Sequence, residues 1–194
     1  MRRRTFDALA SAAGLVIAAV LLAAGGLLLW GHSFVDNQVS TQLSAQKIVF
    51  PATSNPEFKA LPPADAAAMG QYAGQTMTTG AQAKVYADNF IAFHLSMMGG
   101  TYSQLSAQAM AQPNNAKLAA TVNTVFKGTT LRGMLLNAYA FWKLGEIAFW
   151  AAIVSFAGAF ILLVLSGFGL FHARRVAPSA EILTGHAAKA PAKV

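Results

Sequence analysis

Two long runs of apolar residues dominate the hydropathy pattern of the chain. The first extends from Ala8 to Val35 and the second from Ile147 to Phe171, and neither contains Asp, Glu, Lys or Arg. A helix rises about 1.5 Å per residue and the hydrocarbon core of a bilayer is about 30 Å thick, so about 20 apolar residues suffice to cross it. Because lipid satisfies no backbone hydrogen bonds, each run is predicted to be a transmembrane helix.

The residues that flank the two runs predict the orientation of the chain. Arginines stand at 2–4, before the first run, and at 174–175, after the second, and basic flanks remain in the cytoplasm. Aromatic residues that favour a membrane boundary lie at the other ends of the runs: Trp30, Phe34, Trp142, Phe149 and Trp150. We therefore expect a cytoplasmic (inner) membrane protein with cytoplasmic segments at 1–7 and 172–194, the latter disordered, and an extracytoplasmic domain over 36–146.

A cleaved signal peptide is the alternative interpretation of the first run. The sequence Arg3-Arg4-Thr5-Phe6 resembles the core of a twin-arginine signal. The run is longer than the roughly 7–15 residues of an ordinary signal h-region, however, and no good small-x-small cleavage site precedes His32. These two features favour an uncleaved anchor.

The segment between the runs has a helical pattern throughout. Val35, Val39 and Leu43 recur every four residues and extend the first helix outward, and a loop is expected at about 48–63. Capping and turn residues then predict a series of helices: 63–77, about 81–98, 101 or 103 to about 112, 114–126 with Lys127-Gly128 as a C-cap, and 129 or 130 into the second run. No β pattern is present, so the fold class is predicted to be all-α.

Charge and cysteine content exclude several classes of function. The chain has 14 Lys and Arg against 7 Asp and Glu, a net charge of +7, but the basic excess lies mostly in the two tails. This distribution favours contact with anionic lipid headgroups and disfavours binding of nucleic acid. The sequence contains 0 cysteines, which excludes disulfides, thiol nucleophiles and Cys-ligated metals. The outer domain must therefore be stabilised by apolar packing, by the membrane or by a partner.

Three stretches of the outer domain resemble an actinobacterial family of two-pass membrane proteins. They are AKVYADNFIAFHL at 83–95, GGTYS at 99–103 and GTTLRGMLLNAY at 128–139. The resemblance covers nearly all of the chain up to the tail and implies the two-pass architecture, but no established function. Some members are described as aromatic ring-opening dioxygenases, whose iron needs converging histidines and a carboxylate. The predicted topology places the histidines of this chain too far apart to bind one iron ion, so it gives that activity no support. These histidines are His32, His94, His172 and His186.

His94, Met97 and Met98 form a cluster of soft metal ligands. On a helix, residues at i, i+3 and i+4 share one face. Imidazole and thioether groups suit Cu(I), so a copper site is one hypothesis. The alternative is that these side chains fill the helical core or an interface, as methionine often does, and we expect no resident cofactor.

Three charged residues are predicted close to the outer membrane surface. Lys143 and Glu146 stand three residues apart and can form a local ion pair, and Arg132 is a second candidate partner for Glu146. A carboxylate just before an apolar run could also serve as a proton or ion ligand, because charge at membrane depth is expensive. Pairing at the interface is the simpler interpretation.

Small residues recur at helical spacing along both runs. Such stripes let two helices approach closely. They predict packing between the two runs or between subunits, although simple richness in Ala and Gly would look similar. The residues are Gly14, Ala18, Ala19, Ala23 and Gly26 in the first run, and Ala151, Ser155 and Ala159 in the second.

No catalytic pattern stands out, and the sequence therefore predicts a non-enzymatic membrane protein. The first hypothesis is an accessory or scaffold subunit of a larger membrane complex, or a homo-oligomer, with membrane lipids and other subunits as partners. The second is a binding module for a lipid or another apolar ligand held between the outer helices. The third is an extracytoplasmic copper-binding protein centred on His94.

Overall fold

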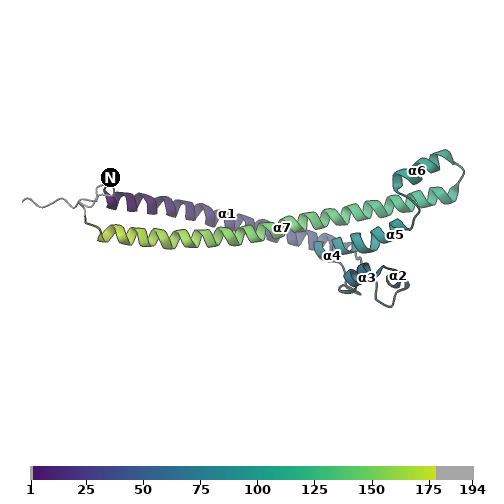
Figure 1. Ribbon diagram of the computed structural model, residues 1–194, viewed down its shortest axis with the longest axis horizontal. Helices are drawn as coiled ribbons and strands as arrows, with labels where there is room; N and C mark the ends of the chain where they lie inside the picture. The colour runs from purple at the N-terminus through teal and green to yellow at the C-terminus, as the bar shows by residue number, and fades with distance from the viewer. Residues whose placement is uncertain (1, 178–194) are drawn as a thin grey trace, which may run out of the picture. The chain divides into compact units, whose positions relative to one another are not determined.

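A computed structural model describes residues 2–177 of the chain, and this range is helical without any strand. Its two longest helices, α1 (Arg3–Ala45) and α7 (Ala116–Arg175), contain the two apolar runs and are long and apolar enough to span a membrane (Figure 1). The predicted all-α fold class is therefore confirmed. The tail predicted to be disordered begins at residue 172, but this is wrong for 172–175, because α7 continues to Arg175. Residues 178–194, including His186, lie outside the described residues.

The chain divides into two compact units. Unit 1 is formed by α1 up to Trp30 and by α7 from Ala148, whereas unit 2 comprises Gly31–Ile147. Both points of division lie close to the outer ends of the predicted spans, at Val35 and Ile147. The unit boundaries and the hydropathy pattern therefore divide the chain in almost the same way.

In unit 1, the two helices run antiparallel and side by side along a seam of small residues (Figure 1). Ala18, Ala152 and Ala159 are fully buried there, and so are the short polar side chains of Ser11 and Ser166. The inward positions of α1 in unit 1 follow an alternating spacing of three and four residues, at 11, 14, 18, 21 and 25. This is the spacing that keeps one seam facing a partner helix, as in a coiled coil.

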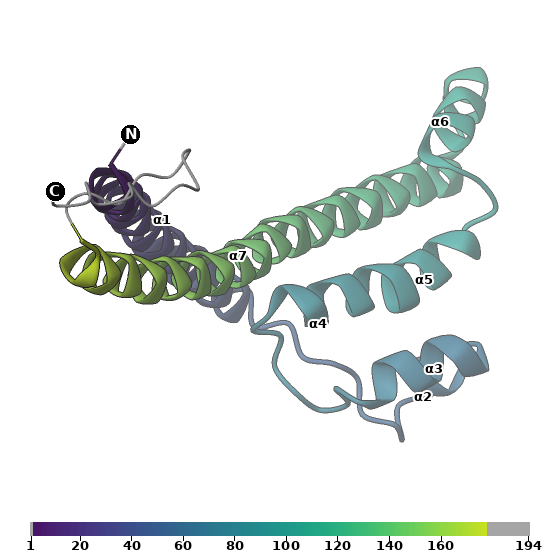
Figure 2. The ribbon, with the colours of Figure 1, turned by 60° about the vertical axis from the view of Figure 1, so that its left-hand side comes forward.

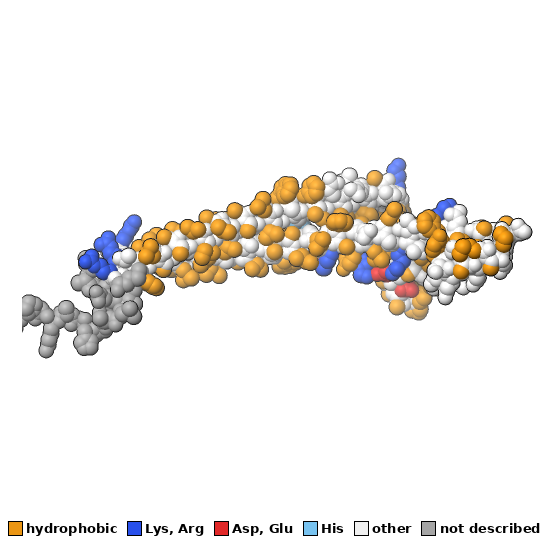
Figure 3. Space-filling model, turned by 90° about the horizontal axis from the view of Figure 1, so that it is seen from above, with side chains coloured by type: hydrophobic (Ala, Val, Ile, Leu, Met, Phe, Trp, Pro, Cys, Tyr) orange, Lys and Arg blue, Asp and Glu red, His pale blue; other side chains and the backbone are white. Residues whose placement is uncertain are grey.

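The outward surface of unit 1 is apolar. Large side chains such as Val16, Leu27 and Val154 are more than three-fifths exposed. Figure 3 shows hydrophobic side chains along these helices and Lys and Arg side chains at the end near the N-terminus. A surface of this kind suits hydrocarbon as the surrounding solvent.

Unit 2 packs several shorter helices against the ends of α1 and α7. They are α2 (Pro56–Lys59), α3 (Pro63–Gly70), α4 (Gly80–Val85), a π-helical segment (Tyr86–Ile91), α5 (Ala92–Ser96) and α6 (Tyr102–Ala111). Figures 1 and 2 show α4 and α5 lying between α3 and α7. The core between these layers is built from large side chains, among which Phe50, Met69 and Met77 are the largest that are fully buried.

Two helices of unit 2 begin at capping boxes. Thr79 caps α4 and exchanges hydrogen bonds with Gln82, while Thr101 does the same with Gln104 at the start of α6. The spacing Thr-x-x-Gln satisfies two backbone N–H groups that a helix start leaves unpaired. The predicted interruption at 78–80 and the predicted cap at Thr101 are both confirmed.

The helix predicted over 63–77 is wrong in its second half. Helix α3 ends at Gly70, and Gly74 then adopts a φ of +74° that favours glycine. The chain turns back there so that the Met77 N–H donates to the Ile48 carbonyl oxygen at 2.8 Å, beside an isolated antiparallel bridge between Val49 and Thr76. The backbone thus uses its hydrogen bonds to hold the segment 48–63, in which Phe50, Phe58 and Leu61 are buried. The loop predicted there is interrupted by the short helix α2, to which Phe58 belongs.

The helix break predicted at Lys127-Gly128 is also wrong, because α7 runs unbroken through these residues. A Cβ at Gly128 would lie 2.8 Å from Cδ2 of Leu95. The glycine therefore allows the close approach of Leu95 and does not end a helix. The start of α7 is capped by Asn115, whose side chain accepts from the Leu118 N–H at 3.0 Å, and not by the predicted Asn114.

Candidate functional site

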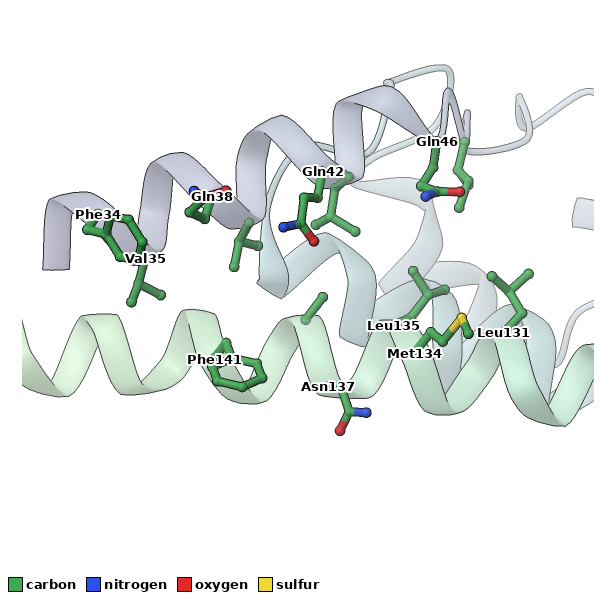
Figure 4. A pocket seen from close by; sticks show the side chains of 14 residues that line it. Phe34, Val35, Gln38, Gln42, Gln46, Leu131, Met134, Leu135, Asn137 and Phe141 are labelled. Atoms are coloured by element: carbon green, nitrogen blue, oxygen red, sulfur yellow. The ribbon is translucent and has the colours of Figure 1, made fainter. Parts of the chain in front are cut away.

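A groove of about 510 Å³ lies within unit 2, between the last turns of α1 and the middle of α7 (Figure 4). This volume falls in the usual range of ligand pockets. Of the described residues that line it, none is charged. They are Phe34, Val35, Gln38, Val39, Gln42, Leu43, Gln46 and Ile48, together with Leu131, Met134, Leu135, Asn137, Ala138 and Phe141.

The groove has a buried floor and an exposed apolar rim. Val39, Leu43 and Leu135 belong to the core of unit 2 and are at most 9% exposed, so the floor is fixed by packing. Met134 and Phe141 on the rim are 64% and 60% exposed. Figure 4 shows Leu131 and Leu135 pointing from α7 toward α1, whereas Asn137 points away from α1.

A row of glutamines follows α1 along the groove. Gln38 and Gln42 stand four residues apart and so share one side of α1, and Gln46 follows directly after the end of this helix. Their amides offer both donors and acceptors without any charge. The groove therefore combines an apolar floor with neutral hydrogen-bonding groups along one wall.

The neighbouring aromatic residue of α7 turns away from the groove. Trp142 packs over Gly80 at the start of α4, where any Cβ would collide with the indole side chain. Trp142, which we predicted at a membrane interface, is thus half-buried within unit 2, whereas Trp30 and Trp150 in unit 1 are exposed.

An ion-pair network joins the π-helical segment to α7. Asp88 pairs with Lys84 and lies 2.8 Å from Nη2 of Arg132, whose Nε donates to the Ala87 carbonyl oxygen at 3.2 Å. Partial burial acts to raise the pKa of Asp88, but hydrogen bonds from Lys84 and Arg132 outweigh it and hold that pKa below its ordinary value. The hydrogen bond between Lys84 and Asp88 also raises the pKa of Lys84. Arg132 is therefore engaged here, and the predicted alternative pairing with Glu146 is wrong.

The second ion pair is local and exposed. Nζ of Lys143 lies 2.5 Å from Oε2 of Glu146, one helical turn away. The hydrogen bond to Glu146 raises the pKa of Lys143. This is the simpler of the two interpretations considered for Glu146.

The soft-ligand cluster around His94 does not share one helical face. Helix α5 ends at Ser96, so Met97 and Met98 lie beyond the helix on which the spacing argument depends. The His94 ring packs against Phe90 and Phe93, and its Nδ1 lies 2.7 Å from the Phe90 carbonyl oxygen. Among residues 2–177, no three or more His, Asp or Glu side chains are grouped as a metal site would require. These contacts favour the packing interpretation.

The predicted small-residue stripes coincide only in part with the seam of unit 1. Ala18 and Ala159 are fully buried, and Gly14, Ala151 and Ser155 are half-buried. Ala19, Ala23 and Gly26 are exposed and lie outside this helix contact, so for these residues packing between subunits stays a prediction. A strict spacing of four drifts around the helix, whereas the real seam alternates threes and fours and includes Gly25, which packs against Phe156.

A second surface was missed by the sequence reasoning. We call the hairpin of α6 and the first turns of α7, residues 102–126, the distal arm. Its 25 residues contain one charge, Lys117, although most of them are exposed. Tyr102, Met110 and Phe126 are 42%, 77% and 52% exposed, and uncharged side chains cover the face of the arm seen in Figure 3. The low charge density was visible in the sequence, since about a quarter of the residues of ordinary domains are charged.

Comparison with known proteins adds no relative: no family model, no curated protein and no solved structure matches this chain.

Proposed function

We propose that the protein is a non-enzymatic, two-pass membrane scaffold that binds another subunit of a membrane complex through its distal arm. The single observation that carries this proposal is the surface of the arm, which is exposed and almost uncharged. The side chains of Tyr102, Met110 and Phe126 are exposed on it. The family resemblance described above implies the same two-pass architecture.

The proposal places both ends of the chain in the cytoplasm and unit 2 outside it. Support comes from the two apolar helices of unit 1, their exposed large side chains and the arginines at 2–4 and 174–175. Cleavage of the first helix would remove one wall of the unit 1 seam and leave Ala152 and Ala159 unpacked. The seam thus supports an uncleaved anchor.

The composition of the distal arm resembles that of a protein interface. Interface cores are depleted in charged residues and enriched in Tyr, Phe and Met relative to other surfaces. Charged residues would make an arm that contacts only water more soluble. Among these 25 residues, however, Lys117 is the single charged one. The partner surface that fits the arm is therefore helical or flat, uncharged and able to bury Met110.

The test is the composition of the particle extracted gently from native membranes, determined by native mass spectrometry. We expect a second protein in the wild-type particle and its loss in the Met110→Glu variant. Val49→Glu is the matched control, since Val49 is an exposed apolar residue of unit 2 outside the arm. A wild-type particle that contains only this chain, or a partner that survives Met110→Glu, would contradict the proposal.

A further inference from the structure

We propose that the groove of unit 2 holds one acyl chain of a membrane phospholipid, which extends out of the bilayer along α1. This inference rests on the membrane insertion proposed above but not on the distal arm or its partner. The groove has no part in the proposed scaffold function, and a phospholipid acyl chain would give it a ligand.

The position of the groove along the chain points to the membrane as the source of its occupant. Phe34, at one end of the groove, belongs to the last turn of the predicted first span, and Gln46 lies at the other end. The helix rises about 18 Å between these residues. Half of a hydrocarbon core measures about 15 Å, which is the reach of one acyl chain. A chain that leaves the bilayer at Phe34 would therefore fill most of the groove without crossing a charged surface.

The volume of the groove and its packed floor suit a single hydrocarbon chain. The groove has a volume of about 510 Å³, and Val39, Leu43 and Leu135 on its floor are apolar and at most 9% exposed. An acyl chain that lies on this floor would be stabilised by the burial of apolar surface.

The lining chemistry agrees with a neutral, mostly apolar ligand. Helices that recognise one another commonly use charged residues beside the apolar seam to fix register and partner, and the lining residues contain none. The amide of Gln38, the glutamine closest to Phe34 along α1, can instead donate a hydrogen bond to an ester carbonyl oxygen of the lipid. Exposed Phe141 and Met134 would cover the chain on the side of α7.

The absence of cysteine makes a direct test possible in the full-length protein. A fluorescent bimane label is attached at Gln42→Cys in the groove or at Thr41→Cys, which neighbours it at nearly the same height but does not line the groove. The protein is reconstituted in phosphatidylcholine vesicles in which some acyl chains carry a nitroxide quencher. We expect several-fold stronger quenching at position 42 than at position 41. Equal quenching at the two positions would overturn the proposal.

Two substitutions of equal exposure on α7 test the groove itself. Phe141 lines the groove and Leu144 does not, although they are 60% and 59% exposed. Phe141→Glu should reduce quenching at position 42 to the level at position 41, whereas Leu144→Glu should leave it unchanged. Equal effects of both substitutions would argue against a chain seated in the groove.

A third label separates failure of the groove from failure of membrane insertion. Val20→Cys places the bimane on the exposed surface of unit 1, in the middle of the predicted span. Quenching at position 20 without quenching at position 42 would reject the lipid groove and leave insertion standing. A lack of quenching at position 20 would reject insertion, and the groove proposal with it.

Discussion

The two units of the molecule use opposite kinds of side chain for packing. Unit 1 joins its helices through Ala18, Ala152 and Ala159, which have almost no side chain. Unit 2 buries Phe50 and Met69 in a layered core. Both long helices contribute to both cores, since α1 and α7 continue from unit 1 into unit 2 and supply Val39 and Leu135 to the core there.

This difference indicates which solvent each unit is built for. In water, burying large apolar side chains supplies the main driving force for folding. In hydrocarbon that force is missing, so helices associate through close contact of small residues and van der Waals packing. The mode of packing therefore changes near Trp30 and Ala148, close to the ends of the two predicted spans.

The largest expected effect comes from removing a large side chain in unit 2. Phe50 is 1% exposed and its ring contacts those of Tyr72 and Tyr86. Phe50→Ala should lower the free energy of unfolding by about 3–5 kcal/mol, because it leaves a cavity in the core. Denaturant unfolding followed by near-ultraviolet circular dichroism would measure this loss. Val49→Ala, next to it and 53% exposed, should change stability little, and an equal effect of both would mean that unit 2 has no such core.

A smaller effect is expected when the seam of unit 1 is widened. Ala18→Leu adds three carbon atoms where the native side chain is fully buried, and overpacking of this kind costs about 1–3 kcal/mol. Ala19→Leu adds the same atoms to the exposed side of the same helix turn. The thermal midpoint in detergent should therefore fall for Ala18→Leu alone. If Ala19→Leu lowers it as much, the seam is misplaced.

The sequence predicts the fold where a strong periodic pattern acts alone. The two runs, the cap at Thr101, one of the two caps predicted for that helix, and the outward continuation of α1 all depend on local rules, and all are present. Local rules mispredict Gly128, because the requirement for glycine there comes from the Leu95 side chain, which is 33 positions away in the sequence. A glycine that allows a close approach cannot be told from a glycine cap without the partner.

The candidate sites were harder to predict for the same reason. Arg132 finds Asp88 on another helix, although Glu146 on its own helix was the candidate that a sequence pattern suggests. The groove combines residues of α1 and α7 that are about 90 positions apart, so no local spacing reveals it. The distal arm is the exception, since the near absence of charge over 102–126 could have been noticed from composition alone.

The smallest effect concerns charge, which unit 2 uses in two different settings. Asp88 is 29% exposed and has two cationic partners, one of them on α7, whereas Glu146 is 36% exposed and pairs with Lys143 three residues away. Asp88→Asn should reduce stability near neutral pH by about 1 kcal/mol, the upper end for exposed pairs. Glu146→Gln should cause a smaller change in the thermal midpoint, since its local pair is open to solvent.

The pH dependence of the Asp88 effect follows from the direction of its pKa shift. Because the pKa of Asp88 is lower in the folded chain than the ordinary value of 3.8, its ionised form stabilises the fold at any pH above that value. The stabilisation is lost as the pH falls through the folded-state pKa. Wild type and Asp88→Asn should therefore differ in thermal midpoint near neutral pH and converge in strong acid. A difference that persists unchanged in acid would show that Asp88 acts through the shape of its side chain, and that charge does not link the π-helical segment to α7.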